Sequence, residues 1–236
     1  MIYKTFPLFI FLLLFSFASK DKKLEKMKLT ETTVVSEIDS KVKSVYFDLH
    51  SNNLELPKFE SFSEALKGFY LIKEKGIVKK DILTLIDFSL SSNTKRLWVI
   101  DLVSNKILYH SLVAHGRNTG GEFATSFSNN ASSFKSSLGF YLTGEIYQGK
   151  HGSSLKLDGL EKGLNDNARE RGIVMHAANY VSSFFIKNNN RLGRSQGCPA
   201  IPIEYSNQII NVIKNKSCLF IYHPTINSYK SLNLFS

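Results

Sequence analysis

Cys198 lies in a segment whose residue types support nucleophilic chemistry: residues 191–200 read Arg-Leu-Gly-Arg-Ser-Gln-Gly-Cys-Pro-Ala. A thiol reacts as its thiolate, which requires a nearby cation or base and oriented backbone N–H groups. Arg191 and Arg194 make the surroundings positive, and Gly197 allows a tight turn beside the thiol. The alternative is a surface turn that holds a buried structural cysteine, because free cysteine is among the most buried residue types. The segment therefore offers a candidate nucleophile that needs a base.

The base has to be one of the histidines. His176 ends the apolar run 172–177, Gly-Ile-Val-Met-His-Ala, which predicts a strand that presents its last side chains to a site. His115 and His151 stand in Gly-rich loops, where they either contact substrate or are simply solvated. We expect structural or surface roles for the remaining three, which are His50, His110 and His223.

A metal site is not indicated by the spacing of the possible ligands. The sequence has no His-x-His or His-Glu-x-x-His motif, and Asp158 and Asp166 have no paired ligand nearby. We therefore predict neither a metal ion nor another cofactor.

The N-terminal residues predict export. Lys4 precedes a short apolar run that ends in Ser-Phe-Ala at residue 18, which is typical of a cleaved signal peptide over residues 1–18. An uncleaved anchor is the alternative, although a spanning helix needs about 20 apolar residues. Residues 19–36 are charged and Thr-rich, and we interpret them as a flexible tether. A cell-envelope or periplasmic location follows, with no stable membrane span after cleavage.

The formal net charge of +10 indicates an anionic partner. For an exported protein this favours a cell-wall polymer or a lipid surface over nucleic acid. The chain has two cysteines, and an exported protein could pair Cys198 with Cys218. We favour a buried strand position for Cys218, because it begins the apolar run 218–222.

Residues 37–78 predict a helical cap segment of two helices, the second beginning at Ser61 or Ser63 and ending near Gly76. From residue 82 the pattern changes to runs rich in β-branched and aromatic residues, with a hairpin at Ser104-Asn105. The predicted strands are 82–90, 96–103, 106–114, 139–147, 154–157, 172–177 and 218–222, and one helix is predicted over 204–214. The fold class is mainly β, a sandwich or a curled mixed sheet with a short N-terminal helical cap and one C-terminal helix.

A histidine at a strand end, followed 22 residues later by the cysteine of Ser-x-Gly-Cys, resembles the L,D-transpeptidase catalytic domain, in particular its murein L,D-transpeptidase branch. The resemblance covers residues 82–224 and leaves 225–236 as a C-terminal tail. It is carried by five strings in this order: Val113-Ala-His-Gly-Arg-Asn-Thr-Gly120, Phe127-Ser-Asn129, Ser136-Ser-Leu-Gly-Phe-Tyr141, Ile173-Val-Met-His-Ala177 and Gly193-Arg-Ser-Gln-Gly-Cys-Pro-Ala200.

The resemblance implies that Cys198 attacks a carbonyl of a peptidoglycan stem peptide, forms a thioester and expels the terminal D-alanine. His176 would be the base, oriented by a backbone carbonyl near Ala177. The N–H groups around Gly197 and Cys198 would stabilise the oxyanion, and a side chain on Gly197 would crowd the approaching carbonyl. If His176 holds Cys198 partly as thiolate, alkylation of Cys198 should stay appreciable below the ordinary thiol pKa of about 8.5.

Substrate contacts are expected from the same segment. Arg194 carries a guanidinium fork that matches a substrate carboxylate. Gln196 stands where a histidine is commoner in the family, so we assign it positioning only. The other residues expected to contact substrate are Ser195, Asn179, His115, Tyr141 and Arg117. The extra length at 184–190 fits either a flap over the site or a plain surface loop.

Three activities remain open at this point. The acyl group passes to an amine, which makes the protein a transpeptidase, or to water, which makes it an L,D-carboxypeptidase or a cross-link hydrolase. A non-catalytic peptidoglycan-binding module is the third alternative, although it would need neither Cys198 nor His176. We expect a monomer that binds peptidoglycan stem peptides and no nucleic acid.

Overall fold

The computed structural model describes residues 37–150 and 152–226. The chain divides into two compact units, 1–44 and 45–236. Of the first unit, residues 37–44 are described; they are helical and belong to a helix over 37–47. The predicted signal peptide, the predicted tether and residues 227–236 of the predicted tail lie outside the described residues.

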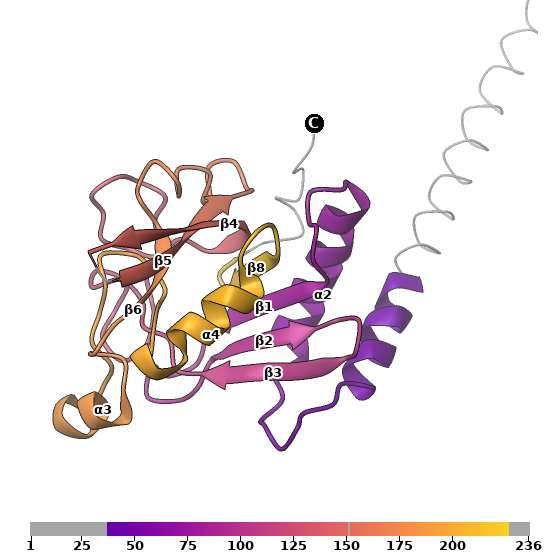
Figure 1. The fold of residues 1–236 in the computed structure, drawn as a ribbon, viewed down its shortest axis with the longest axis horizontal. Helices are drawn as coiled ribbons and strands as arrows, with labels where there is room; N and C mark the ends of the chain where they lie inside the picture. The colour runs from indigo at the N-terminus through magenta and orange to yellow at the C-terminus, as the bar shows by residue number, and fades with distance from the viewer. Residues whose placement is uncertain (1–36, 151, 227–236) are drawn as a thin grey trace, which may run out of the picture. The chain divides into compact units, whose positions relative to one another are not determined.

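Eight strands form one mixed sheet in the order β3-β2-β1-β8-β4-β5-β6-β7 (Figure 1). Two neighbouring pairs, β1–β8 and β6–β7, are parallel, and the other pairs are antiparallel. The predicted curled mixed sheet is therefore confirmed. The strands are β1 (Ile82–Asp87), β2 (Leu97–Asp101), β3 (Lys106–Ser111), β4 (Gly139–Gly149), β5 (Gly152–Gly159), β6 (Val174–Ala177), β7 (Ala200–Ile201) and β8 (Cys218–Tyr222).

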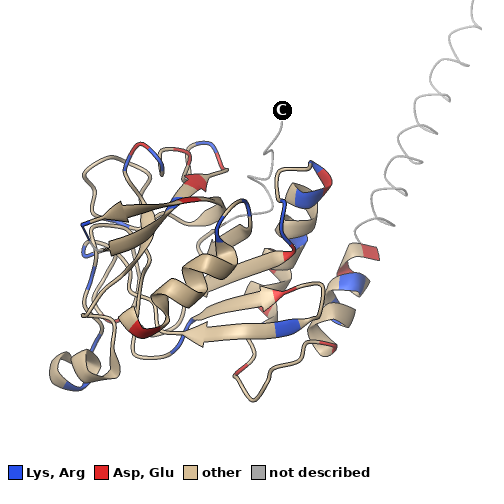
Figure 2. Ribbon diagram, viewed as in Figure 1, with Lys and Arg blue, Asp and Glu red and all other residues tan. Residues whose placement is uncertain are grey.

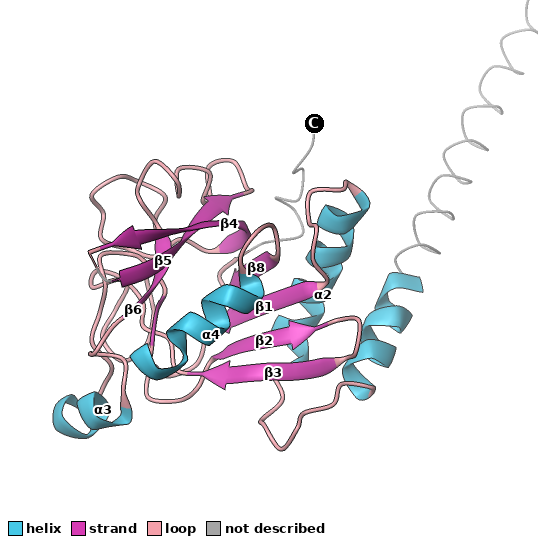
Figure 3. Cartoon of the chain, viewed as in Figure 1, coloured by secondary structure: helices cyan, strands magenta, loops and turns pink. Residues whose placement is uncertain are grey.

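In the part of the chain that the structure describes, three further helices accompany the sheet: α2 (Phe59–Glu74), α3 (Ser183–Asn189) and α4 (Ile203–Ile213) (Figure 3). α2 buries Phe62, Leu66 and Phe69, whose spacing of three and four residues puts them on one helical face. Both α2 and α4 pack against β1, and residues 83–87 of this strand are all buried. No helix within 37–150 and 152–226 is long and apolar enough to cross a membrane.

Two connections differ from the sequence prediction. The turn between β2 and β3 contains residues 102–105 rather than Ser104-Asn105 alone, and Asn105 adopts a left-handed φ of 50°. Residues 183–189 form the short helix α3, where the sequence left a flap or a loop open. The helix begins because the Ser182 hydroxyl accepts a hydrogen bond from the Phe185 N–H, and it ends at Asn190, whose φ is 55°.

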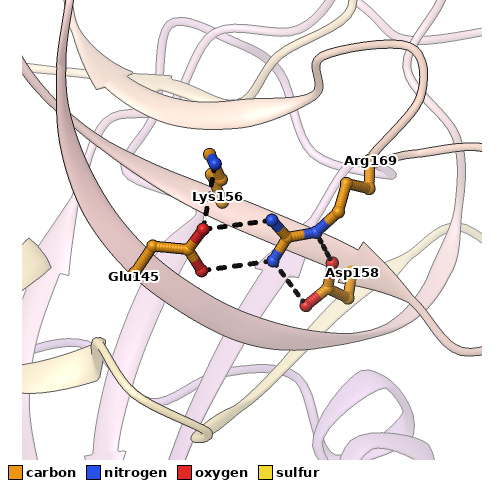
Figure 4. A network of polar contacts seen from close by, with 4 residues as sticks. All are labelled: Glu145, Lys156, Asp158 and Arg169. Carbon is orange, nitrogen blue, oxygen red and sulfur yellow. Dashed lines mark hydrogen bonds and ion pairs between the residues drawn. The ribbon is translucent and has the colours of Figure 1, made fainter.

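An exposed charge network lies between β4, β5 and the loop that follows β5 (Figure 4). The Glu145 carboxylate accepts two hydrogen bonds from Arg169, at 3.1 and 3.2 Å, and pairs with Lys156 at 2.9 Å. Arg169 also pairs with Asp158. These partners hold the pKa of Glu145 below its ordinary range, with Arg169 the largest cause. Exposed pairs stabilise little, so the network mainly orients the loop.

The loop over residues 160–172 is anchored more firmly by two buried polar side chains. The Glu161 carboxylate accepts a hydrogen bond from the Phe140 N–H at 2.6 Å. The Asn165 amide donates to the carbonyl oxygens of Leu138 at 2.9 Å and Phe140 at 3.0 Å. Because these bonds satisfy buried backbone groups in β4 and in the residue just before it, they are expensive to break. The loop therefore leads into β6 from a fixed position.

Candidate active site

Cys198 and His176 line one cavity of about 580 Å³. Three of the expected substrate-binding residues, Arg194, Ser195 and Gln196, line it as well. The remaining lining residues are Ser132, Phe134, Tyr147, Lys150, Ser154, Arg171, Gly172, Ile173, Val174 and Tyr180. The fold thus gathers the two candidate catalytic residues with part of the predicted substrate set.

The parallel pair β6–β7 brings His176 and Cys198 to this cavity. His176 lies opposite Ala200, and Cys198 comes two residues before Ala200 in the approach to β7. At that level the Val174 N–H donates a hydrogen bond to the Cys198 Sγ at 3.5 Å. Because strand pairing sets the register, the distance along the sheet between thiol and imidazole is determined by backbone hydrogen bonds.

The His176 ring is oriented by the backbone. Its Nδ1 lies 2.9 Å from the carbonyl oxygen of Ala177, the carbonyl that the family resemblance predicted. A carbonyl oxygen only accepts, so Nδ1 carries the proton and, in the neutral ring, Nε2 carries the lone pair. This tautomer suits a general base, because the Nε2 lone pair can accept a proton.

A hydroxyl closes the turn that presents the thiol. The Ser195 Oγ accepts a hydrogen bond from the Gly197 N–H at 3.1 Å and donates to the Cys198 carbonyl at 2.6 Å. Ser195 is therefore a structural part of the turn, although it also lines the cavity. The Gly197 N–H, expected at the oxyanion, is engaged within the turn. Within the described residues the Cys198 N–H donates to no backbone or side-chain oxygen.

Gly197 is required by its backbone. Its φ is +125°, which side chains rarely adopt, and a Cβ there would lie 2.9 Å from the Lys135 carbonyl oxygen. A side chain at position 197 would thus collide with the loop that contains Lys135, whereas we expected it to collide with substrate.

The surroundings of Cys198 disfavour its thiolate form. The residue is half-buried, and burial raises the pKa of the thiol above its ordinary value. The Val174 N–H and the Arg171 guanidinium lower this pKa without offsetting burial. This direction runs against the expected partial thiolate and favours removal of the thiol proton during the reaction. Both cysteines are free, so the alternative disulfide does not form.

Arg171 is a cavity residue that the sequence analysis did not single out. Its guanidinium donates to the carbonyl oxygens of Ser128 at 2.9 Å and Lys135 at 2.7 Å, and to the hydroxyls of Ser137 at 2.9 Å and Ser133 at 3.3 Å. The sequence signal that could have identified Arg171 is its position: it ends a polar, Gly-containing loop just before the strand that carries His176.

Arg194 acts partly as a brace. Its Nη1 donates to the carbonyl oxygens of Gly120 at 3.0 Å and Arg117 at 3.3 Å, so it holds the loop over residues 115–121. The Arg117 guanidinium stacks over the ring of Phe134 at 3.9 Å from its centroid. Gln196 is exposed at the cavity.

Four predicted substrate residues, Arg117, His115, Tyr141 and Asn179, lie outside the cavity lining. His115 is 1% exposed, its Nδ1 lies 2.8 Å from the Arg96 guanidinium, and burial with that cation lowers its pKa to about 4. Tyr141 is fully buried and donates to the Ser137 carbonyl at 2.9 Å. Asn179 is exposed in the loop after β6. His151 lies outside the described residues.

The cavity is positively charged. Lys150, Arg171 and Arg194 line it, and within the described residues no aspartate or glutamate does. Figure 2 shows that basic and acidic residues both occur in the loops around β4 to β6. The excess of positive charge is therefore a property of the cavity lining and not of these loops as a whole. Across the described residues 37–150 and 152–226, no group of three or more His, Cys, Asp or Glu side chains could hold a metal ion.

A family model described as the L,D-transpeptidase catalytic domain matches residues 53–222. The chain belongs to this family. The match includes α2 together with the whole sheet.

Solved L,D-transpeptidase structures are among the similar chains. An L,D-transpeptidase from Mycobacterium smegmatis shares 9% identity, covering 61% of this chain and 59% of that one, with a TM-score of 0.39. The helical cell shape determining protein Pgp2 from Campylobacter jejuni shares 13% identity over 66% and 53%, with a TM-score of 0.40. An L,D-transpeptidase from Xylanimonas cellulosilytica shares 11% over 77% and 91%, with a TM-score of 0.35.

This chain therefore spans about three fifths of the length of the first of these structures. No curated protein matches it.

Proposed function

We propose that this protein is an exported cysteine L,D-transpeptidase in which Cys198 is the nucleophile and His176 the general base. The observation that carries the proposal is that both side chains line one cavity, with the His176 ring fixed by the Ala177 carbonyl at 2.9 Å. Membership of the L,D-transpeptidase family supports the reaction class, and the cavity lining supports the choice of Cys198 and His176.

The reaction has two halves. In the first, His176 Nε2 takes the thiol proton as the Cys198 Sγ bonds to the carbonyl carbon of a stem-peptide diamino acid. The C–N bond to the terminal D-alanine breaks, the imidazolium returns its proton to that amine, and a thioester remains. In the second, an acceptor amine forms a C–N bond to the thioester carbonyl carbon and gives a proton to His176 Nε2. The C–S bond breaks, and the imidazolium returns that proton to the sulfur, which restores the thiol.

The oxyanion is stabilised by the Cys198 N–H, since the Gly197 N–H already donates to Ser195. The raised pKa of the resting thiol favours concerted proton transfer to His176 rather than a preformed ion pair. The thiol is then activated only when a carbonyl is in place.

Substrate selection fits the positive cavity. Stem peptides carry carboxylates, and Arg194 and Lys150 line the cavity with no acidic neighbour in its described lining. Gln196 is exposed beside the nucleophile and offers an amide donor and acceptor to the peptide. Among the remaining predictions, Asn179, His115 and Tyr141 would act from outside this lining.

The test incubates the purified full chain with a defined tetrapeptide muropeptide, with and without an acceptor stem peptide, and analyses products by mass spectrometry. We expect D-alanine release and a cross-linked product, both lost in Cys198→Ser. D-alanine release without any cross-link would replace the transferase by a hydrolase. Binding of muropeptide with no turnover by the wild type would replace it by a wall-binding module.

A further inference from the structure

The strongest unassigned feature of the cavity is the cation Arg171. It makes four hydrogen bonds, and every acceptor is a neutral carbonyl or hydroxyl oxygen between Ser128 and Ser137. Within the described residues no carboxylate forms an ion pair with it. A partly buried cation without a counter-ion is unfavourable, and burial indeed lowers the pKa of Arg171. Its natural complement is a negative charge that forms in the cavity.

The sulfur on which that negative charge would form belongs to Cys198, in the turn that adjoins Arg171. The Arg171 Nη2 lies 3.5 Å from the position that a Cβ on Gly197 would occupy, and Cys198 follows directly. Arg171 and Cys198 also line the same cavity. Of the described charged groups around the thiol, Arg171 is the one that lowers its pKa.

Direct binding of a substrate carboxylate is a less suitable role for Arg171. Both Nη1 and Nη2 already use two donors each on protein oxygens, which leaves the Nε–H alone. A bidentate grip needs two parallel N–H donors. Arg171 is therefore held as a fixed charge, whereas Arg194 remains the better carboxylate ligand.

We propose that Arg171 is a positioning residue that stabilises the Cys198 thiolate through its fixed charge, and that its hydrogen bonds hold residues 128–137 against the turn that carries Cys198. The inference rests on the proposed function insofar as Cys198 is the nucleophile. It adds a fixed cation to a site in which the base, His176, titrates.

Other charged or titratable groups line the cavity together with the thiol and have to be separated from Arg171. They are Tyr147 on β4, Lys150 from the β4–β5 turn, His176 on β6, Tyr180 after β6, and Arg194 before the Cys198 turn. The test therefore changes the charge at residue 171 alone and compares it with an arginine of the same loop that lies outside the cavity.

The experiment measures the rate of Cys198 alkylation by iodoacetamide from pH 6 to 10, in the full chain, by peptide mass. The variants are Arg171→Gln, Arg171→Lys and the control Arg169→Gln, which removes the same charge from the exposed network. We expect Arg171→Gln to raise the midpoint by about one pH unit, which makes alkylation at pH 7 roughly tenfold slower. Arg171→Lys and Arg169→Gln keep the wild-type midpoint.

Equal midpoints in all four proteins would overturn the proposal, as would equal shifts in the Gln and Lys variants of Arg171, which would mean a purely structural role. If Arg171→Gln shows no urea unfolding transition, Arg171→Lys decides: an unchanged midpoint with lowered stability supports the fixed charge, and a raised midpoint overturns it. A midpoint shift in a protein that never turns over muropeptide would support Arg171 while contradicting the proposed function.

Discussion

The Ser136 hydroxyl donates a hydrogen bond to the Gly197 carbonyl oxygen at 2.9 Å, across 61 residues of sequence. The same hydroxyl accepts a hydrogen bond from the Gly116 N–H at 3.0 Å. One buried serine thus joins two loops to the turn that carries Cys198. The geometry of the thiol is therefore set by loops that are far away in the chain.

Ser136→Ala removes both bonds and leaves a buried N–H and a buried carbonyl unsatisfied. We expect the free energy of unfolding to fall by about 1–3 kcal/mol and D-alanine release to slow, because the turn loses its support. Urea unfolding and the muropeptide assay measure the two effects. Ser183→Ala, at an exposed serine of α3, is the matched control and should change neither. Equal behaviour of the two variants would show that Ser136 does not hold the turn.

Gly197→Ala tests the strained turn. The φ of +125° and the 2.9 Å approach of a Cβ to the Lys135 carbonyl oxygen both oppose a side chain. We expect a loss of about 1–3 kcal/mol of stability and at least a hundredfold loss of turnover, which urea unfolding and the muropeptide assay would detect. Gly121→Ala is the control, because a Cβ there meets no atom within 4 Å. Wild-type turnover in Gly197→Ala would contradict this account.

The raised pKa of Cys198 predicts how alkylation depends on pH. Because burial favours the neutral thiol, the rate of reaction with iodoacetamide should stay low at pH 7 and reach its midpoint above the ordinary thiol value of about 8.5. A midpoint near pH 6 would instead indicate a preformed thiolate. The measurement is the rate of adduct formation on Cys198, since Cys218 is fully buried.

His176→Ala removes the proposed base while leaving the Cys198 turn intact. We expect D-alanine release to fall by about 10²–10⁴-fold, the usual contribution of a positioned base. His110→Ala is the histidine control, because His110 stacks on Trp98 and lies outside the cavity lining. The muropeptide assay measures both, and similar losses in the two variants would remove His176 from its role.

His115 makes stability depend on pH in a defined direction. Its folded pKa of about 4 lies below the ordinary value of about 6.5, so the unfolded chain binds more protons between these values. The stabilisation is complete above about pH 6.5 and is lost as the pH falls toward 4, by up to about 3 kcal/mol.

His115→Asn keeps an acceptor for Arg96 and does not titrate. We expect its urea midpoint to change less than that of the wild type between pH 7 and pH 5. The same slope in both proteins would show that His115 does not control this part of the profile.

Local pattern was sufficient for much of the fold. Runs of β-branched and aromatic residues predicted β1, β2 and β8, and the 3.6-residue periodicity predicted α2 and α4. These features depend on which face of one segment is buried, and sequence records that directly. The α3 helix was missed because it is only seven residues long and none of its side chains is fully buried.

The residues of the candidate site also fall into two groups, those indicated by the sequence and those found only in the tertiary structure. The sequence by itself indicated Cys198, His176 and the need for glycine at 197, because residue type and order along the chain carry those signals. Three features became visible only in the tertiary structure. Arg171 lines the same cavity as the thiol, and the Gly197 N–H donates to Ser195 within the turn. His115 and Tyr141 are buried outside the cavity lining. The physical reason is that hydrogen-bond partners and burial are long-range properties: Arg171 contacts Ser128 across 43 residues, and no local pattern encodes that distance.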